Sequence, residues 1–413
     1  MARKSIRFLR GKCEDGIIRL YIERGSPLYK NLLDELHFRI YRKKEDDFQQ
    51  GNDYYEYFDA LDYKDAKLIY DGSLQKQDSY CFVYTDSDVK PLDIYAYWVA
   101  YKDDIVPSGP VGVSVRHPDV WWTFQRINDV MERLYTAYQG PKSLSSYGYS
   151  TRKKKLKGLV LGNPDRCIGL IGAVHAGESG PELFLSAAET IIRNYPDLLK
   201  KTGLAILPSV NADCREDMAT GTPQYIRCNP NGVDLNRNFD AGWDTVDLTY
   251  GLNTSIHGSI TYRGPFPQSE DETNTVINFI DKVRPAVIFN GHCLSSICGD
   301  CFLTPRNSQS DEEYKNRCIE LITPYSQGFR DVDKEGLSFH YGTTAGSVPA
   351  YVYKKYGIPA FDMEYRTVKD EKRERDCVIG RTTPELLQEY IGYHTKGIIN
   401  LMKYMAGNEG DIT

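Results

Sequence analysis

The sequence predicts two domains of different fold class: an all-β sandwich over residues 1–116, and an α/β domain over residues 117–413 whose mostly parallel, mixed central sheet is flanked by helices. Three observations support this prediction. The chain has 413 residues, more than a single hydrophobic core usually spans. Short runs of alternating apolar and polar residues dominate its first part. In its second part, nearly continuous apolar runs alternate with helix-like patterns, which is typical of α/β folds.

The first domain is predicted from short strands separated by turn residues. LHFRI (36–40) and DIYAYWVAY (93–101) alternate in polarity, and GVSV (112–115) follows the turn PSGP. Further strand-like runs are IIRLYIE (17–23), KLIYDG (67–72) and SYCFVYT (79–85). Such regularly interrupted strands predict a β-sandwich. The last part, IYAYWVAYKDDIVPSGPVGVSV, resembles the final two strands of a fibronectin type III domain.

The hydrophobic period changes after Pro118. Apolar residues then recur at spacings of three and four, at Val120, Phe124, Ile127, Met131, Leu134 and Tyr138. This spacing predicts an amphipathic helix of roughly twenty residues that ends at Gly140. The polar segment KSLSSYGYSTRKKK that follows is expected to be a loop.

Five apolar runs predict the central sheet of the second domain. They are LKGLVLG (156–162), CIGLIGAVH (167–175), LAILPSV (204–210), PAVIFNGH (285–292) and IPAFDMEY (358–365). Strands that are buried on both faces have this composition. PELFLSAAETIIRN and SEDETNTVINFIDKV predict helices between them, and Ser269 with Glu272 forms the pattern of a capping box.

The composition argues against several classes of partner. A formal net charge of −6 offers no basic footprint for nucleic acid. No segment reaches the roughly 20 apolar residues that a membrane span requires. The N-terminus lacks the apolar region of a signal peptide, and the ten cysteines are scattered. We therefore expect reduced thiols and a cytoplasmic location; a secreted or periplasmic location would follow if a signal peptide had been removed.

Histidine and glutamate residues fall at the ends of three predicted strands. His175 and Glu178 follow the second strand as H-x-x-E, His292 ends the fourth, and Glu364 lies at the end of the fifth. Ligands of open α/β sheets gather at the carboxyl ends of the strands. Two histidines and one glutamate would suit zinc and leave a coordination position for water. Taken alone, the H-x-x-E pair also fits a structural, hydrogen-bonded histidine.

Five stretches in order resemble the zinc metallocarboxypeptidase family, of which carboxypeptidase A is the namesake. They are GAVHAGE, RCNPNGVDLNRNFD, YRGPFPQSEDE, GHCLSS and HYGTTAGSVPAYVYKKYGIPAFDMEY. The resemblance covers residues 118 to 405. It implies hydrolysis of peptides that carry a free C-terminal carboxylate, by attack of a metal-activated water, with one Zn²⁺ per chain.

The resemblance also assigns roles to individual residues. It implies that His175, Glu178 and His292 bind zinc, that Glu364 is the general base, and that Arg227 stabilises the oxyanion. It further implies that Asn236, Arg237 and Tyr341 clamp the substrate carboxylate and that Val348 lies at the floor of the specificity pocket. Because Val348 is apolar, we expect a preference for apolar C-terminal residues.

Neighbouring polar residues receive other expectations. Asp234 and Asn238 are expected to shape the loop, and Asp362 is considered as a carboxylate behind the metal ligands. His257 and His340 match no ligand position. Cys293 departs from the family pattern, where the third ligand is commonly followed by glycine or a small hydroxyl residue.

Two alternative functions remain open. The first is a zinc amidase that acts on non-standard amides, such as cell-wall peptides or acylated amino acids, because a carboxylate clamp would serve these substrates too. The second is a catalytically inert binding or scaffold protein whose β domain binds an unknown protein partner. The presence of every motif residue argues against inertness.

Overall fold

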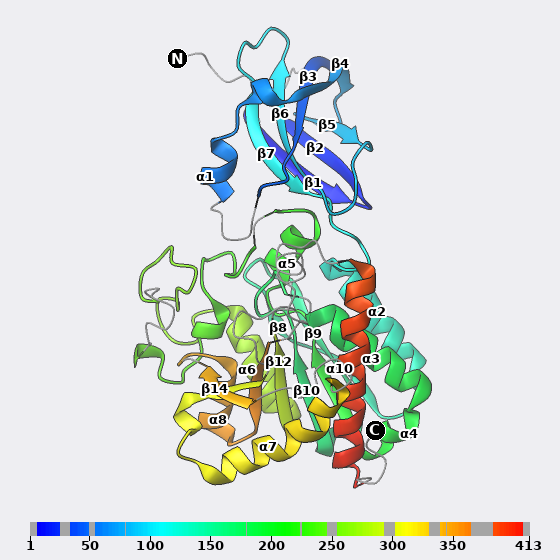
Figure 1. Ribbon diagram of the computed structural model, residues 1–413, viewed down its shortest axis with the longest axis vertical. Coiled ribbons are helices and arrows are strands. Elements are labelled where there is room, and N and C mark those ends of the chain that lie inside the picture. The colour runs from blue at the N-terminus through cyan, green and yellow to red at the C-terminus, as the bar shows by residue number, and fades with distance from the viewer. Residues whose placement is uncertain are drawn as a thin grey trace. The chain divides into compact units, whose positions relative to one another are not determined.

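The computed structural model describes residues 6–24, 34–48, 54–78, 80–178, 180–223, 225–245, 254–292, 302–329, 339–343, 345–364 and 383–407 (Figure 1). Contacts divide the chain into two compact units. The first unit consists of Met1–Trp121, Asp217–Tyr225 and Ile379–Thr383. The second unit consists of Trp122–Glu216, Ile226–Val378 and Pro384–Thr413. No helix in the described ranges is long and apolar enough to cross a bilayer.

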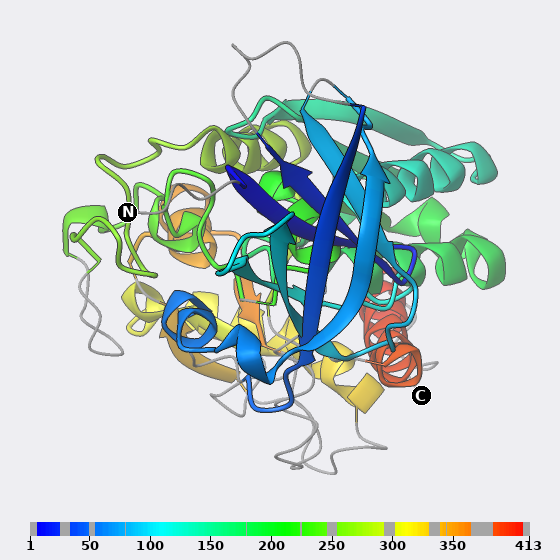
Figure 2. The ribbon, with the colours of Figure 1, turned by 90° about the horizontal axis from the view of Figure 1, so that it is seen from above.

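The first unit is a β-sandwich, as predicted. Its strands are β1 (Phe8–Glu14), β2 (Ile17–Glu23), β3 (Glu35–Lys44), β4 (Lys67–Gln75), β5 (Cys81–Asp86), β6 (Ile94–Tyr101) and β7 (Ser108–Ser114). They form a three-stranded sheet, β1-β2-β5, and a four-stranded sheet, β4-β3-β6-β7, in which every pairing is antiparallel. Figure 2 shows these strands, in blue to cyan, from above.

The alternation in the sequence explains the packing of this unit. In β3, Leu36, Phe38 and Ile40 are buried while the residues between them are more exposed. Side chains alternate between the faces of a strand, so these three point into one core, which they share with Leu20 of β2 and Phe82 of β5. The resemblance to a fibronectin type III domain stays a prediction.

The second unit is built on a mixed sheet. The strand order is β14-β13-β15-β12-β10-β11-β9-β8. The strands are β8 (Lys142–Tyr149), β9 (Lys155–Gly162), β10 (Cys167–Ile171), β11 (Gly203–Leu207), β12 (Val287–Gly291), β13 (Phe302–Pro305), β14 (Phe339–Thr343) and β15 (Ala360–Met363). The neighbours β11, β10, β12 and β15 are parallel. The five predicted strands are thus confirmed, although β10, β11, β12 and β15 end earlier than their apolar runs.

One predicted loop is a strand. The polar segment beginning at Lys142 forms β8, which pairs antiparallel with β9 at the edge of the sheet. Its side chains are mostly partly exposed, with Tyr147 buried. An edge strand with an exposed face tolerates serine and lysine, so its composition resembles that of a loop.

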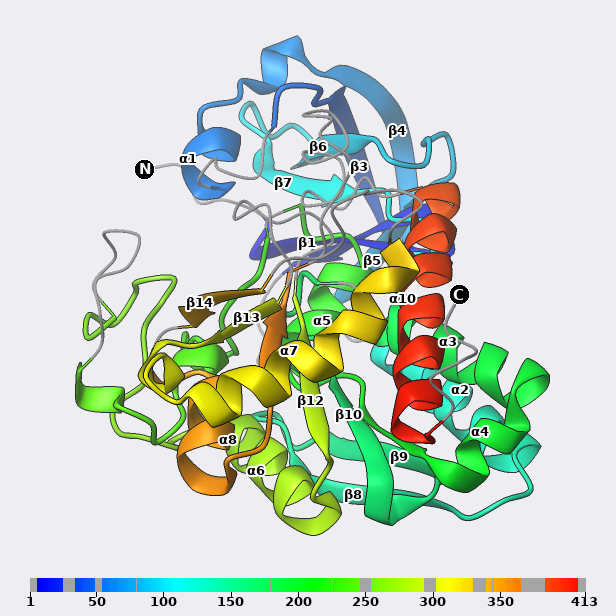
Figure 3. The same cartoon turned by 60° about the horizontal axis from the view of Figure 1, so that its bottom comes forward.

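Helices flank both faces of this sheet, as predicted. They are α2 (Phe124–Ala137), α3 (Gly180–Asn194), α4 (Pro196–Lys201), α5 (Ala212–Ala219), α6 (Asp271–Val283), α7 (Glu312–Ser326), α8 (Val348–Tyr356) and α10 (Pro384–Met405). The helices α6 and α8 share a hydrophobic core with β8, β10 and β12. Figure 3 shows α3 and α10 side by side, away from α6 and α8.

Two helix starts differ from the prediction. The helix α2 begins at Phe124 rather than near Val120, because the side chain of Thr123 caps it by accepting a hydrogen bond from Arg126 N. The capping box predicted for α6 is wrong, because residue 270 is the N-cap and makes no side-chain cap hydrogen bond. The buried Glu272 carboxylate instead accepts hydrogen bonds from the backbone and the side chain of Thr151.

Candidate metal centre

Three neighbouring parallel strands end at the same level of the sheet. In the register, Asn290 of β12 pairs with Ile171 of β10 on one side and with Asp362 of β15 on the other. The chain continues from the end of β10 to His175, from the end of β12 to His292 and from the end of β15 to Glu364. Parallel strands in register therefore bring chemically active side chains from distant parts of the sequence to one edge.

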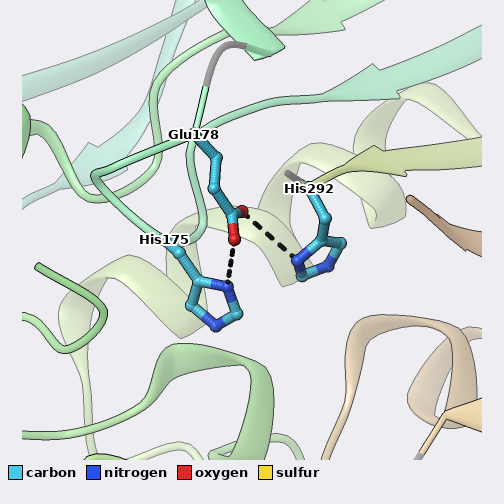
Figure 4. A group of neighbouring side chains, drawn as sticks. All are labelled: His175, Glu178 and His292. Carbon is cyan, nitrogen blue, oxygen red and sulfur yellow. Dashed lines mark hydrogen bonds and ion pairs between the residues drawn. The ribbon is translucent and has the colours of Figure 1, made fainter. Parts of the chain in front are cut away.

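The structure brings His175, Glu178 and His292 together (Figure 4). The Nδ1 atom of His175 lies 3.0 Å from Glu178 Oε1, and the Nδ1 atom of His292 lies 3.3 Å from Glu178 Oε2. The two imidazole centroids are 4.9 Å apart. All three side chains are buried.

This group fits a zinc ion. One ligand atom from each side chain lies within 4.8 Å of the other two. Zinc–nitrogen distances of 2.0–2.1 Å in a tetrahedral site place neighbouring ligand atoms roughly 3.4 Å apart, close to the separations observed. Imidazole nitrogens and a carboxylate oxygen are also the donors that zinc prefers.

The loop after β10 sets the position of the first two members. It is fixed to the chain after β11 by hydrogen bonds from Val210 N to Gly172 O and from Asn211 N to Ala173 O. A Cβ atom on Gly172 would lie 2.5 Å from the carbonyl oxygen of Pro208, so only glycine permits this close approach. The side chain of Arg215 donates to the carbonyl oxygens of Ala176 and Glu178.

The charges of the group are mutually dependent. Burial by itself would raise the pKa of Glu178, but His175 and His292 lower it well below its usual range. Burial would likewise lower the pKa of His292, but the carboxylates of Asp362 and Glu178 raise it well above its usual range. The site therefore holds an ionised glutamate between two imidazoles.

The sequence did not predict the contact of Asp234 with His175. Its Oδ1 atom lies 2.9 Å from His175 Nε2, and its Oδ2 atom accepts a hydrogen bond of 2.8 Å from Arg227 Nε. Burial would raise the pKa of Asp234, but Arg227 and His175 lower it strongly. It also shapes the loop, as expected, because Oδ1 accepts from the backbone N–H of Asn236.

Asp362 lies beside His292, a candidate metal ligand. Its Oδ1 atom is 3.1 Å from His292 Nε2. Burial would raise the pKa of Asp362, but His292 and the amides of Asn290 and Asn236 lower it. The contribution of Asn290 was not anticipated, since an asparagine inside an apolar strand gives no distinctive signal.

Glu364 lies directly after β15 and is partly exposed. Burial of the carboxyl group raises its pKa to about 7. His292 lowers this pKa, and the negative charge of Glu178 raises it further. These interactions place its carboxyl group in the electrostatic field of the triad. A carboxyl group with this pKa can exchange a proton near neutral pH.

The residues predicted to bind substrate occupy different surroundings. The amide of Asn236 donates to Asp362 and accepts from the backbone N–H of Val348. Arg237 is buried, and its guanidinium donates to the carbonyl oxygen of Asn236. Val348 is the first residue of α8 and is fully buried, which places it in the core shared with α6.

Tyr341 lies on β14, where its ring contacts Phe339 at a centroid distance of 5.3 Å. Its hydroxyl group has no hydrogen-bond partner among the described residues. His257 is exposed, as expected for a residue outside the site. Cys293 lies outside the described residues.

Comparisons with known proteins agree with this geometry. A family profile described as zinc carboxypeptidase matches residues 127–377. Carboxypeptidase O of Bos taurus is 32% identical over 138 residues, which cover 30% of this chain and 35% of that protein. Murein peptide amidase A of Escherichia coli (strain K12) is 29% identical over 163 residues, which cover 39% of this chain and 60% of that protein. The chain thus spans less than two thirds of the length of these relatives.

Solved structures share the fold. Bovine thrombin-activatable fibrinolysis inhibitor in complex with tick carboxypeptidase inhibitor has a TM-score of 0.55 at 17% identity, over 70% of this chain and 99% of that chain. Carboxypeptidase A from Helicoverpa armigera has the same TM-score at 16% identity, over 71% of this chain and 76% of that chain. The profile match covers more than half of the sequence and includes the triad. The chain therefore belongs to the zinc carboxypeptidase family.

Proposed function

We propose that this protein is a zinc-dependent carboxypeptidase that removes residues from the C-terminus of peptides and binds one Zn²⁺ per chain. The observation that carries the proposal is the buried group of His175, Glu178 and His292 with the carboxyl group of Glu364 in its field. These three side chains would hold the ion. When bound, zinc would act as a Lewis acid that polarises the scissile carbonyl and activates water.

Glu364 is the proposed general base. As a carboxylate, it would take a proton from the attacking water and return that proton to the departing amine nitrogen. Arg227 is the proposed electrophile for the oxyanion of the tetrahedral intermediate. Its Nε atom is held by Asp234, which directs the planar guanidinium while its charge stays fixed.

Arg237, Asn236 and Tyr341 are proposed to recognise the C-terminal carboxylate. A guanidinium can bind a carboxylate through two parallel hydrogen bonds, and a chain that continues has no carboxylate to offer. The side-chain nitrogen of Asn236 donates to Asp362 and also lies 3.5 Å from His292 Nε2. The proposed preference for apolar C-terminal side chains rests on the sequence position of Val348 alone, because its side chain is fully buried in the core shared with α6.

A direct experiment combines metal analysis with the release of C-terminal residues. We expect one zinc per chain, release of Phe or Leu faster than Lys, and loss of activity with a chelator. His175→Ala should lose both zinc and activity, whereas His257→Ala, which alters an exposed histidine, should keep both. A wild-type chain without zinc, or one that is active in the presence of the chelator, would refute the proposal.

The second candidate is a zinc amidase that acts on cell-wall peptides or acylated amino acids. The similarity to murein peptide amidase A supports it, because it extends over a larger share of the sequence than the similarity to carboxypeptidase O. Incubation with simple peptides and with muropeptides side by side would separate the two. An inert scaffold is disfavoured because none of the proposed catalytic residues is replaced.

We further propose a reducing, cytoplasmic environment. The described cysteines are all free thiols, and of these only Cys228 is not buried. Their arrangement supports an environment in which disulfides do not form.

A further inference from the structure

Asp362 is placed by the sheet itself. Asp362 on β15 pairs in register with Asn290 on β12. Asp362 lies two positions before Glu364, and Asn290 lies two positions before His292. Residues two apart on a strand point to the same face. The parallel register therefore puts the carboxylate of Asp362 beside the imidazole of His292.

Three donors surround this carboxylate. Oδ1 lies 3.1 Å from His292 Nε2 and accepts a hydrogen bond of 2.7 Å from Asn290 Nδ2. Oδ2 accepts a hydrogen bond of 2.9 Å from Asn236 Nδ2. Asn290 Nδ2 also lies 2.8 Å from His292 Nε2. Asp362 is 5% exposed, so water can supply little of its hydrogen bonding.

This arrangement argues against a role in binding the substrate. A carboxylate that recognised a basic side chain would need an oxygen facing the pocket, whereas both oxygens of Asp362 already accept from protein groups. An amide offers only one accepting oxygen, so it could not accept from Asn290 on one side-chain atom and from Asn236 on the other. Burying a negatively charged carboxylate costs free energy. Its presence beside His292 therefore indicates that the charge acts on this imidazole.

The other imidazole of the triad has the same arrangement. Nδ1 of His175 faces Glu178, and Nε2 faces a carboxylate oxygen of Asp234. In His292, Nδ1 again faces Glu178 and Nε2 faces Asp362. A carboxylate on Nε2 keeps the ring proton there, leaves the lone pair of Nδ1 for a metal, and makes that nitrogen more basic.

We propose that Asp362 is the positioning residue for His292: it fixes the tautomer and orientation of this imidazole and thereby strengthens the metal site. The inference rests on the proposed function, since it takes His292 to be a metal ligand. It gives the centre two carboxylate–histidine pairs: Asp234 holds the ring of His175 beside Glu178, and Asp362 holds the ring of His292.

The test compares the full-length wild type with Asp362→Asn, which keeps the shape and removes the charge. Zinc affinity is measured by competition with a chromogenic chelator, and the visible spectrum is recorded after substitution with Co²⁺. We expect Asp362→Asn to bind zinc about 10- to 100-fold more weakly and to shift the cobalt bands. Asp165→Asn, which makes the same change at an exposed position, should match the wild type in both.

The outcomes separate the inference from the proposed function. A wild type that binds no zinc refutes the proposed function itself. A wild type that binds zinc, with equal affinity and an equal cobalt spectrum in Asp362→Asn, overturns only the role of Asp362. Circular dichroism reports whether the variant folds. If it does not, proton NMR of the zinc-loaded wild type decides: two slowly exchanging imidazole N–H signals support the inference, and a single signal that Asp234→Asn abolishes refutes it.

Discussion

At the scale of single residues, Glu364 is the group whose proton affinity matters most. Its pKa of about 7 arises because burial and the negative charge of Glu178 outweigh the attraction of His292. A bound divalent cation nearby would lower this pKa, so the carboxylate would be ionised and able to accept a proton at neutral pH.

Replacement of this carboxyl group should separate catalysis from metal binding. We expect Glu364→Gln to lower kcat by about 10²- to 10⁴-fold, because general base catalysis is lost, while one zinc per chain is retained. Steady-state kinetics and metal analysis provide the measurements. Glu313→Gln, an exposed change on α7, serves as the control. A variant that loses its zinc, or changes only in KM, would contradict the assigned role.

The two arginines should differ in their kinetic effects. Arg237→Ala should mainly raise KM, because the substrate carboxylate loses its partner before and during the reaction. Arg227→Ala should mainly lower kcat, because the oxyanion forms only in the transition state. Steady-state assays of both variants on one peptide test this division. Equal changes of both constants in the two variants would count against it.

At the scale of secondary structure, α10 carries a buried titratable group. The Nδ1 atom of His394 and the hydroxyl group of Tyr325 on α7 form a hydrogen bond of 2.8 Å. Burial lowers the pKa of His394 to about 3. In the unfolded chain a histidine has a pKa of roughly 6.5, so unfolding takes up a proton between these values and acid destabilises the fold.

Removal of this histidine should flatten the pH dependence of stability. As the pH falls from 6 to 4, the wild type should lose about 1.4 kcal/mol of unfolding free energy per pH unit relative to His394→Gln. The difference is fully present above pH 6.5 and declines below it. Urea unfolding of both proteins at several pH values measures it. Curves that stay parallel across this range would show that His394 is charged in the folded state.

At the scale of the whole molecule, the proposed metal links distant parts of the sequence. The ligands come from the loop after β10 and from the end of β12, so the ion would hold two strand ends of the second unit together. An ion that binds only the folded state stabilises it by mass action, by about 4 kcal/mol at a thousand times the dissociation constant.

Removal of zinc should therefore lower the thermal stability of the second unit. We expect Tm to fall after dialysis against a chelator and to rise again as zinc is added, in proportion to the logarithm of its concentration. Differential scanning calorimetry follows this dependence. His175→Ala should show a Tm that does not respond to zinc, and a wild type that behaves in the same way would exclude an ion held by the triad.

The sequence by itself determined the fold class, the central strands and the candidate ligand triad. Apolar runs long enough to be buried on both faces identified β9, β10, β11, β12 and β15, and polar residues at their carboxyl ends marked His175, Glu178, His292 and Glu364. These features are local, so they can be recognised along the chain. The edge strand β8 was missed because half-exposed strands have the composition of loops.

Only the tertiary structure decided which residues stand behind the triad. Asp234 reaches His175 because the loop before Asn236 folds back toward it, and Asp362 reaches His292 because β12 and β15 are parallel and in register. The position of Asp362 two residues before Glu364 indicated its face of the strand. The contact of Asp234 with His175 leaves no such pattern, since it depends on the relative position of two segments. A shift of one residue in that register would turn Asp362 to the other face of the sheet and away from His292.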